Sequence, residues 1–258
     1  MLSTYKERKS VADWPFRIAG RIPRYGLRMA VFLLLHGACH GGWCWDAVAD
    51  RLRGRGHAAV APDLPCEDLT AGPSQYADTA AAALDGTRPD DVVLVAHSLG
   101  GLSAPVLARM LPVRRLVFVA GIVGAPRRSL EQLADVDEDR DGPLDSDDIE
   151  TDAEHRFRFS AGGARRLLFH DCAPDAAAAA ASRLRFQRSL WTAVADFDAW
   201  PDVETVSVVC TQDRVVNPAW SERVARERLG VEPVRLDSGH SPWLSRPDEL
   251  TDILTAGL

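Results

Sequence analysis

The chain has 258 residues, of which 46% are hydrophobic and 26% charged, and its formal net charge is −7. These values are typical of a single globular domain with a sizeable core. The excess of acidic side chains argues against nucleic-acid binding. The sequence contains no run of eighteen apolar residues, so it does not predict a membrane span. Five unpatterned cysteines argue against a disulfide scaffold and favour a reducing, cytoplasmic location.

The first 28 residues differ from the rest of the chain. They carry seven basic and two acidic side chains and lack the continuous apolar stretch of a secretory signal. We expect residues 1–28 to form an N-terminal extension without a catalytic part, because a buried-strand pattern begins at Met29. Both lysines of the chain, Lys6 and Lys9, lie in this extension. Cofactor chemistry that needs an amine in the core, such as a P-loop or a pyridoxal Schiff base, is therefore excluded.

From Met29 onward, apolar runs of strand length alternate with amphipathic stretches of helix length, a pattern that predicts a parallel α/β sheet. Strands are expected near 30–36, 57–62, 91–97, 114–120, 205–211 and 232–237. Helices are expected near 43–53, 74–85, 99–111, 218–229 and 247–257. The core would then comprise residues 29–121 and 205–258, with about six mainly parallel strands and helices on both faces.

Residues 122–204 are too long for a simple crossover and predict a cap, or lid, over an active site. The segment contains an acidic stretch, a short strand candidate at 155–159 and an alanine-rich helix near 174–188. Within the acidic stretch, residues 137–148 follow the spacing of a calcium loop, but the last position is Asp instead of a bidentate Glu. A solvated acidic turn is the favoured interpretation, so we assign no metal.

Residues 96–101, Ala-His-Ser-Leu-Gly-Gly, follow an apolar strand and precede a helix, which is the context of a nucleophile elbow. Ser98 is the candidate nucleophile, and Ala96 replaces the usual first glycine by another small residue. His240, just past the last strand, is the candidate base. Asp213, just past the preceding strand, is the candidate acid, because the strand before that ends in Ala-Gly without a carboxylate. The order Ser, Asp, His is that of an α/β-hydrolase triad.

An acyl-transfer site also needs an oxyanion hole. The amide of Leu99, directly after the nucleophile, and that of Ala38, in the glycine-rich loop after the first strand, are the candidate donors. Cys39, Phe157 and Trp191 are candidate substrate-binding residues, with core packing as the alternative for the two aromatic rings. The remaining histidines near these motifs, among them His36, His40 and His97, are interpreted as structural.

Taken singly, Ser98 and Asp213 are also compatible with caps of a helix and a turn, and His240 with a surface histidine. Their joint occurrence at strand ends, in the order of a triad, favours catalysis.

Several stretches together resemble the α/β-hydrolase superfamily and, within it, the hydroxynitrile lyase and methylesterase family. They are His-Gly-Ala-Cys-His-Gly-Gly-Trp-Cys-Trp at 36–45, residues 56–64, 96–101, Phe-His-Asp-Cys-Ala-Pro at 169–174, 210–214 and 239–245. The resemblance implies a six-stranded core with a small mixed cap. It also implies an esterase and not a lyase, because cyanohydrin-cleaving members carry Lys and Thr where this chain has Ser241 and Gly37. Its Arg- and Ala-rich composition resembles bacterial esterase-like relatives.

The expected function is hydrolysis of a small carboxylic ester without a cofactor. A thioesterase, lactonase or cyclase using the same triad is the alternative, and a hydroxynitrile lyase or a ligand receptor without turnover is less favoured. The partner is then a small-molecule ester or thioester, without nucleic acid or membrane. The sequence leaves the oligomeric state open, a homodimer included.

Overall fold

The computed structural model describes residues 29–84, 92–111, 113–133 and 145–258. In these ranges six strands form one sheet in the order β2-β1-β3-β4-β7-β8. They are β1 (Val31–Leu35), β2 (Ala58–Val60), β3 (Val92–His97), β4 (Arg115–Val119), β7 (Glu204–Cys210) and β8 (Val234–Leu236). All neighbouring strands of this sheet are parallel, whereas the sequence predicted strands that are only mainly parallel.

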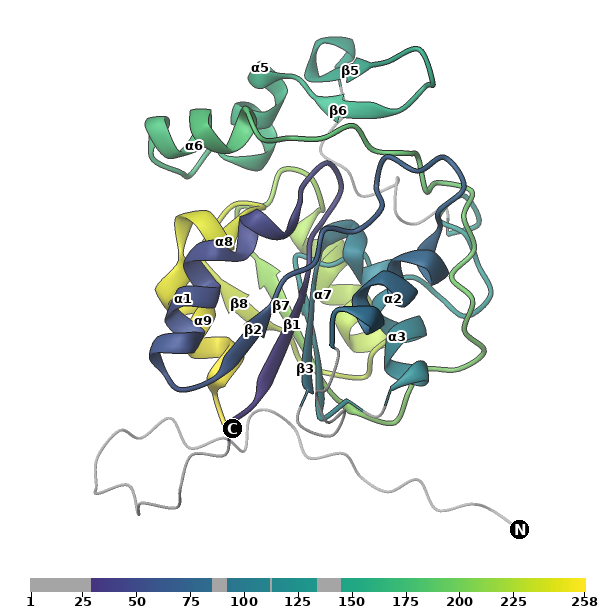
Figure 1. Ribbon diagram of the computed structural model, residues 1–258, viewed down its shortest axis with the longest axis vertical. Helices are drawn as coiled ribbons and strands as arrows, with labels where there is room; N and C mark the ends of the chain where they lie inside the picture. The colour runs from purple at the N-terminus through teal and green to yellow at the C-terminus, as the bar shows by residue number, and fades with distance from the viewer. Residues whose placement is uncertain (1–28, 85–91, 112, 134–144) are drawn as a thin grey trace.

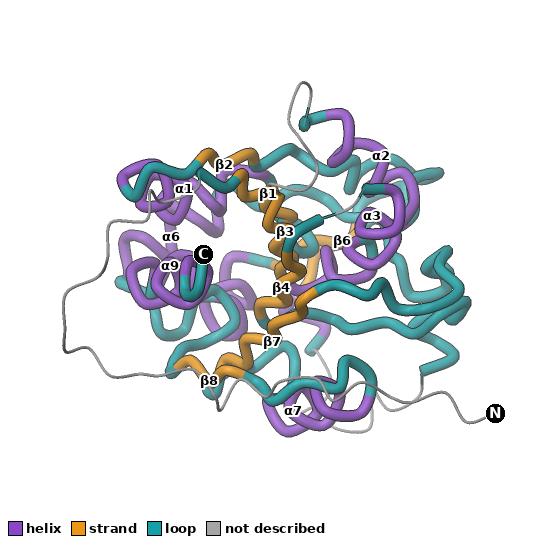
Figure 2. The backbone as a smooth tube through the Cα atoms, turned by 90° about the horizontal axis from the view of Figure 1, so that it is seen from below, coloured by secondary structure: helices purple, strands orange, loops and turns teal. Residues whose placement is uncertain are grey.

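The central strands β1, β3 and β4 are buried along their whole length, as their continuous apolar sequences predict. Helices cover both faces of the sheet (Figure 2). One face carries α1 (Asp46–Gly54) and α9 (Pro247–Thr255), and the other carries α2 (Pro73–Ala82), α3 (Ala104–Met110) and α7 (Pro218–Glu227). The sheet therefore separates two apolar cores. The strands expected near 114–120 and 205–211 are confirmed, and the structure shows in addition that they pair with each other although a long segment separates them in sequence.

Residues 145–187, between β4 and β7, form a separate layer beyond one end of the sheet (Figure 1), whereas residues 188–203 return along the α2 and α3 face of the core. The strands β5 (Ile149–Thr151) and β6 (Phe157–Phe159) of this layer pair antiparallel. The chain then continues through α5 (Ala161–Gly163), a π-helical turn (Ala164–Leu168) and α6 (Pro174–Ala181). We call residues 145–187, which make up this layer, the cap.

The helix α6 ends seven residues earlier than the alanine-rich run predicts. The backbone of Gln187 exchanges two hydrogen bonds with Phe157 of β6, with N···O distances of 2.9 and 2.7 Å. This pairing requires an extended chain, because a residue within a helix would already use its amide and carbonyl inside the helix. Tertiary contacts therefore outweigh the helix propensity of the alanines.

Two expectations fall wholly or largely outside the described residues, namely the N-terminal extension 1–28 and residues 137–144 of the calcium-loop candidate. Of the described carboxylates of that candidate, Asp145 and Asp148 form ion pairs with Arg166. Among the described residues, no group of three or more potential metal ligands occurs and no helix is long and apolar enough to span a membrane.

Candidate active site

Ser98 lies at a sharp turn between β3 and a 3₁₀-helix that spans Ser98–Leu102. Its φ of 49° is in the left-handed region, which a non-glycine residue rarely adopts and which is typical of a nucleophile elbow. The turn leaves no space for a side chain two residues later, since a Cβ on Gly100 would lie 2.7 Å from the carbonyl oxygen of His36. Close packing against the backbone is thus the reason why small residues are required around the serine.

The three candidate triad residues form one chain of hydrogen bonds. The hydroxyl of Ser98 donates to Nε2 of His240 at 3.0 Å, and Nδ1 of His240 donates to Oδ2 of Asp213 at 2.8 Å. The other oxygen of Asp213 accepts from the amides of Val215 and Val216 at 2.7 and 3.0 Å. Because both carboxylate oxygens have partners, the Asp213 side chain is fixed in the orientation that holds the imidazole. All three side chains are buried.

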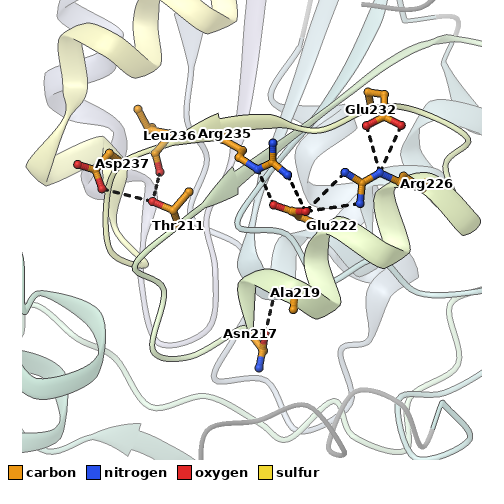
Figure 3. Close-up of polar contacts among 9 residues, drawn as sticks. All are labelled: Thr211, Asn217, Ala219, Glu222, Arg226, Glu232, Arg235, Leu236 and Asp237. Atoms are coloured by element: carbon orange, nitrogen blue, oxygen red, sulfur yellow. Dashed lines mark hydrogen bonds and ion pairs between the residues drawn. The ribbon is translucent and has the colours of Figure 1, made fainter.

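The loops that carry the acid and the base are bonded to each other. The amide of Thr211 donates to the carbonyl of Leu236 at 2.9 Å, and the side chain of Gln212 donates to Asp237 at 2.6 Å. Figure 3 shows the hydroxyl of Thr211 bonded both to the carbonyl of Leu236 and to the carboxylate of Asp237. The ends of β7 and β8 therefore keep Asp213 and His240 at a defined separation.

Ion pairs join β8 and the loop before it to α7, as Figure 3 also shows. Glu222 of α7 accepts two hydrogen bonds from Arg235 of β8, at 2.6 and 2.9 Å. Arg226, one turn further along α7, binds Glu232 at 3.1 Å. These pairs connect α7 to the edge strand and to the loop before it, and exposed ion pairs of this kind add little stability.

His97, directly before the nucleophile, is fully buried and supports the base. Its Nε2 donates to the backbone carbonyl of His240 at 2.8 Å, and the two ring centroids are 4.8 Å apart. Burial lowers the pKa of His97 well below its usual value, so the ring is neutral. A structural role was expected from sequence, but its direct contact with His240 was not.

The candidate oxyanion loop is held by two further neutral histidines. His36 donates from Nδ1 to the carbonyl of Gly37 at 2.8 Å and accepts from the amide of Leu64 at 2.9 Å. His40 donates from Nδ1 to the carbonyl of Ala38 at 2.6 Å. Burial lowers the pKa of His36 to about 4 and that of His40 to about 3. Both rings therefore act as positioning groups at neutral pH, as expected.

The two predicted oxyanion donors are the amides of Ala38, which lies in this loop, and of Leu99, which directly follows the nucleophile. Among the hydrogen bonds of turns and loops in the described ranges, neither amide is used as a donor. A Cβ on Gly37 would lie 2.8 Å from Cβ of Ser98, so the loop and the elbow are in contact. The arrangement is compatible with two free amides near the nucleophile.

The structure brings together two of the three predicted substrate-binding residues. The buried thiol of Cys39 donates to the carbonyl of Phe157 at 3.6 Å, which ties the loop after β1 to the cap strand β6. Trp191 packs instead against the core on the other side of the sheet. Binding of substrate by these residues stays a prediction, and the contacts explain Cys39 as a link between the core and the cap.

Sequence reasoning assigned no role to two cap residues that contact the triad loops, His170 and Asp171. They lie in the stretch 169–174, which was noted only for its resemblance to a family pattern. Periodicity could not identify them, because their partners are backbone groups far away in sequence.

Comparisons with known proteins agree with this geometry. A model of the "Alpha/beta hydrolase family" matches residues 32–253. Methylesterase 7 of Arabidopsis thaliana is 26% identical over 244 residues, which cover 86% of this chain and 94% of that protein. Methyl jasmonate esterase 1 of Vitis vinifera is 25% identical over 248 residues, with coverages of 85% and 93%. These relatives are plant proteins, so the expected placement among bacterial esterases is not confirmed.

Solved structures show the same fold. Polyneuridine aldehyde esterase superposes with a TM-score of 0.74 at 20% identity, covering 88% of this chain and 98% of that one. A pyrethroid hydrolase from Sphingobium faniae JZ-2 gives 0.69 at 22% identity, with coverages of 88% and 96%. With the six-stranded sheet, the nucleophile turn and a family model that spans most of its length, the chain belongs to the alpha/beta hydrolase family.

Proposed function

We propose that the protein is a serine hydrolase that cleaves a small carboxylic ester through an acyl-enzyme intermediate. The observation that carries this proposal is the continuous chain of hydrogen bonds from Ser98 through His240 to Asp213. The esterase names of the relatives that cover most of this chain support the substrate class. Methyl esters are therefore the first substrates to test.

In the proposed reaction, Oγ of Ser98 attacks the ester carbonyl while Nε2 of His240 accepts the hydroxyl proton. Asp213 stabilises the resulting imidazolium through Nδ1, and the two oxyanion amides bind the negative oxygen. The imidazolium then protonates the leaving alkoxide, and the alcohol departs. Water attacks the acyl-enzyme by the same sequence of proton transfers, which releases the acid and restores Ser98.

A hydroxynitrile lyase is not supported. No lysine occurs after residue 9, and the residue that follows the base is Ser241, which is fully buried. A departing cyanide would find no ammonium group at this position. A thioesterase or a lactonase would use the same triad and the same attacking water but a different leaving group, namely a thiol or an alcohol that stays attached to the acyl chain. A cyclase would replace the attacking water by a nucleophile of the substrate itself.

The test compares wild type with Ser98→Ala on methyl and p-nitrophenyl esters of increasing acyl length, together with labelling by a fluorophosphonate. We expect Ser98→Ala to lose labelling and to lower kcat by about 10⁶-fold, because the nucleophile and base act as a unit. Ser103→Ala is the matched control, since the buried hydroxyl of Ser103 has no hydrogen-bond partner among the described residues and Ser103 directly follows the 3₁₀-helix that Ser98 begins. Wild-type protein that neither turns over any ester nor reacts with the probe would refute the proposal.

A further inference from the structure

Two consecutive cap residues bind the two loops that carry the candidate acid and base. Nε2 of His170 donates to the carbonyl of Gln212 at 2.9 Å. Oδ2 of Asp171 accepts from the amide of Gly239 at 2.8 Å. Gln212 directly precedes Asp213, and Gly239 directly precedes His240. His170 and Asp171 thus connect the loop of the acid to the loop of the base, as the hydrogen bond between Asp213 and His240 also does.

The fit between this dipeptide and the base loop is close. A Cβ on Gly239 would lie 2.6 Å from Oδ1 of Asp171 and 2.7 Å from Nε2 of His170, distances that real Cβ atoms essentially never show. A third contact reinforces the acid loop, where Arg214 donates to the carbonyl of Arg166 at 3.2 Å. Both loops therefore have the cap as a direct neighbour.

The cap segment itself is held in place independently of these polar contacts. Phe169, directly before His170, is fully buried and packs edge-on against His40 and Trp243 of the core, with ring centroids 6.1 Å from each. Removing the polar group of residue 170 or 171 therefore leaves the apolar anchor of the segment intact. The loops would lose their partner while the cap stays packed.

The nucleophile, in contrast, is positioned by the core. The carbonyl of Ser98 accepts from the amide of Ile122 at 2.9 Å, and its Cβ lies against Gly37. Among the hydrogen bonds and ion pairs of the described residues, none joins Ser98 to the cap. A change in the cap dipeptide should thus displace acid and base relative to a serine that does not move.

We propose that His170 and Asp171 are positioning residues for the proton-transfer pair, holding Asp213 and His240 in register with Ser98 from the cap side. The proposal deepens the proposed ester hydrolysis and rests on it. The cap is then part of the device that orients the general base, in addition to any contact with substrate. A displacement of about 1 Å in such a group costs about 10²-fold in rate.

The test uses pairs of substitutions in the full chain. Asp171→Ala and His170→Phe remove the hydrogen bonds, whereas Asp171→Asn and His170→Gln retain an acceptor for Gly239 and a donor for Gln212. We expect the first pair to lower kcat by about 10- to 100-fold with KM within about twofold, and the second pair to stay within about threefold of wild type. Each kcat is calculated per active site, and the active sites are counted by complete labelling with a fluorophosphonate. Unfolded protein therefore does not contribute to the value.

Asp175→Asn is the matched control, because Asp175 is an exposed carboxylate of the same cap, four positions further along. Equal kcat per labelled site in Asp171→Ala, His170→Phe and wild type would overturn the proposal. So would equal losses in Asp171→Ala and Asp171→Asn.

A second readout does not depend on turnover. The far-downfield proton resonance of the His240 Nδ1–H···Asp213 bond should shift or broaden in Asp171→Ala and remain unchanged in Asp175→Asn. An unchanged resonance in Asp171→Ala would refute the positioning role. A wild-type protein that shows the resonance and its loss in Asp171→Ala, but no ester turnover, would contradict the proposed function alone.

Discussion

Gly101→Ala tests whether the nucleophile turn is positioned by backbone packing. A Cβ at position 101 would lie 2.4 Å from the carbonyl oxygen of Ile122, whereas ordinary C···O contacts are about 3.3–3.6 Å. The overlap is therefore about 1 Å. No side-chain rotation can relieve it, because the neighbouring atom belongs to the backbone. Either the turn or the segment after β4 must move.

The size of the effect follows from two contributions. Overpacking in a core costs about 1–3 kcal/mol, and weakening the hydrogen bond from Ile122 to the carbonyl of Ser98 adds about 0.5–1.5 kcal/mol. A combined loss of about 1.5–4.5 kcal/mol leaves a domain of typical stability folded. A shift of the turn by about 1 Å should in addition lower kcat by about 10²-fold.

The assay combines urea denaturation with ester turnover per labelled site, for Gly101→Ala and for Gly54→Ala as control. Gly54 is the last residue of α1, and its Cβ would meet nothing within 4 Å. The control should therefore be more stable than wild type by about 0.5–1 kcal/mol and equally active. If Gly101→Ala matched wild type in both stability and kcat, the argument from backbone packing would be refuted.

Three further predictions concern the acid, the buried rings and the thiols. Asp213→Asn should lower kcat by about 10⁴-fold in steady-state ester assays without unfolding the protein, because an amide group favours the wrong tautomer of His240. Burial holds the pKa of His36 near 4 against an ordinary 6.5, so the unfolded chain binds more protons, and the unfolding free energy should fall as the pH drops from about 6.5 to 4. Denaturation at pH 7 and pH 5 should show this loss, which for this ring amounts to at most about 1.4 kcal/mol per pH unit. His36→Gln should reduce the dependence of the unfolding free energy on pH, and an unchanged dependence would contradict the prediction. Burial raises the pKa of the Cys172 thiol to about 12, so N-ethylmaleimide at pH 7.5 should leave activity intact and label the protein only after denaturation, as mass spectrometry can verify.

Sequence patterns were sufficient for the sheet and for the order of the candidate triad. Continuous apolar runs identify buried parallel strands, and the carboxyl ends of such strands meet at one edge. Ser98 follows β3 directly, and Asp213 and His240 lie within four residues of the ends of β7 and β8, so their convergence could be inferred without knowing the packing. Their hydrogen bonds agree with that inference, although the catalytic roles stay a proposal.

The remaining details depend on contacts between segments that are distant in sequence. The bond from His97 to the carbonyl of His240 spans 143 positions, and that from Asp171 to Gly239 spans 68. No local pattern encodes either bond, because one partner is a backbone group that every residue type possesses. The early end of α6 has the same origin, since Gln187 pairs with β6.

The apolar core on the α1 and α9 side of the sheet has a consequence for attempts to change the substrate range by exchanging caps. Phe159, Leu168 and Phe169 of the cap belong to the same buried cluster as Trp243 and Leu250 of the hydrolase core. A foreign cap grafted between β4 and β7 would have to replace these contacts or leave large apolar side chains open to water. Successful chimeras should therefore carry matched residues in α8 (Pro242–Ser245) and α9, so that the two segments are inherited as one unit.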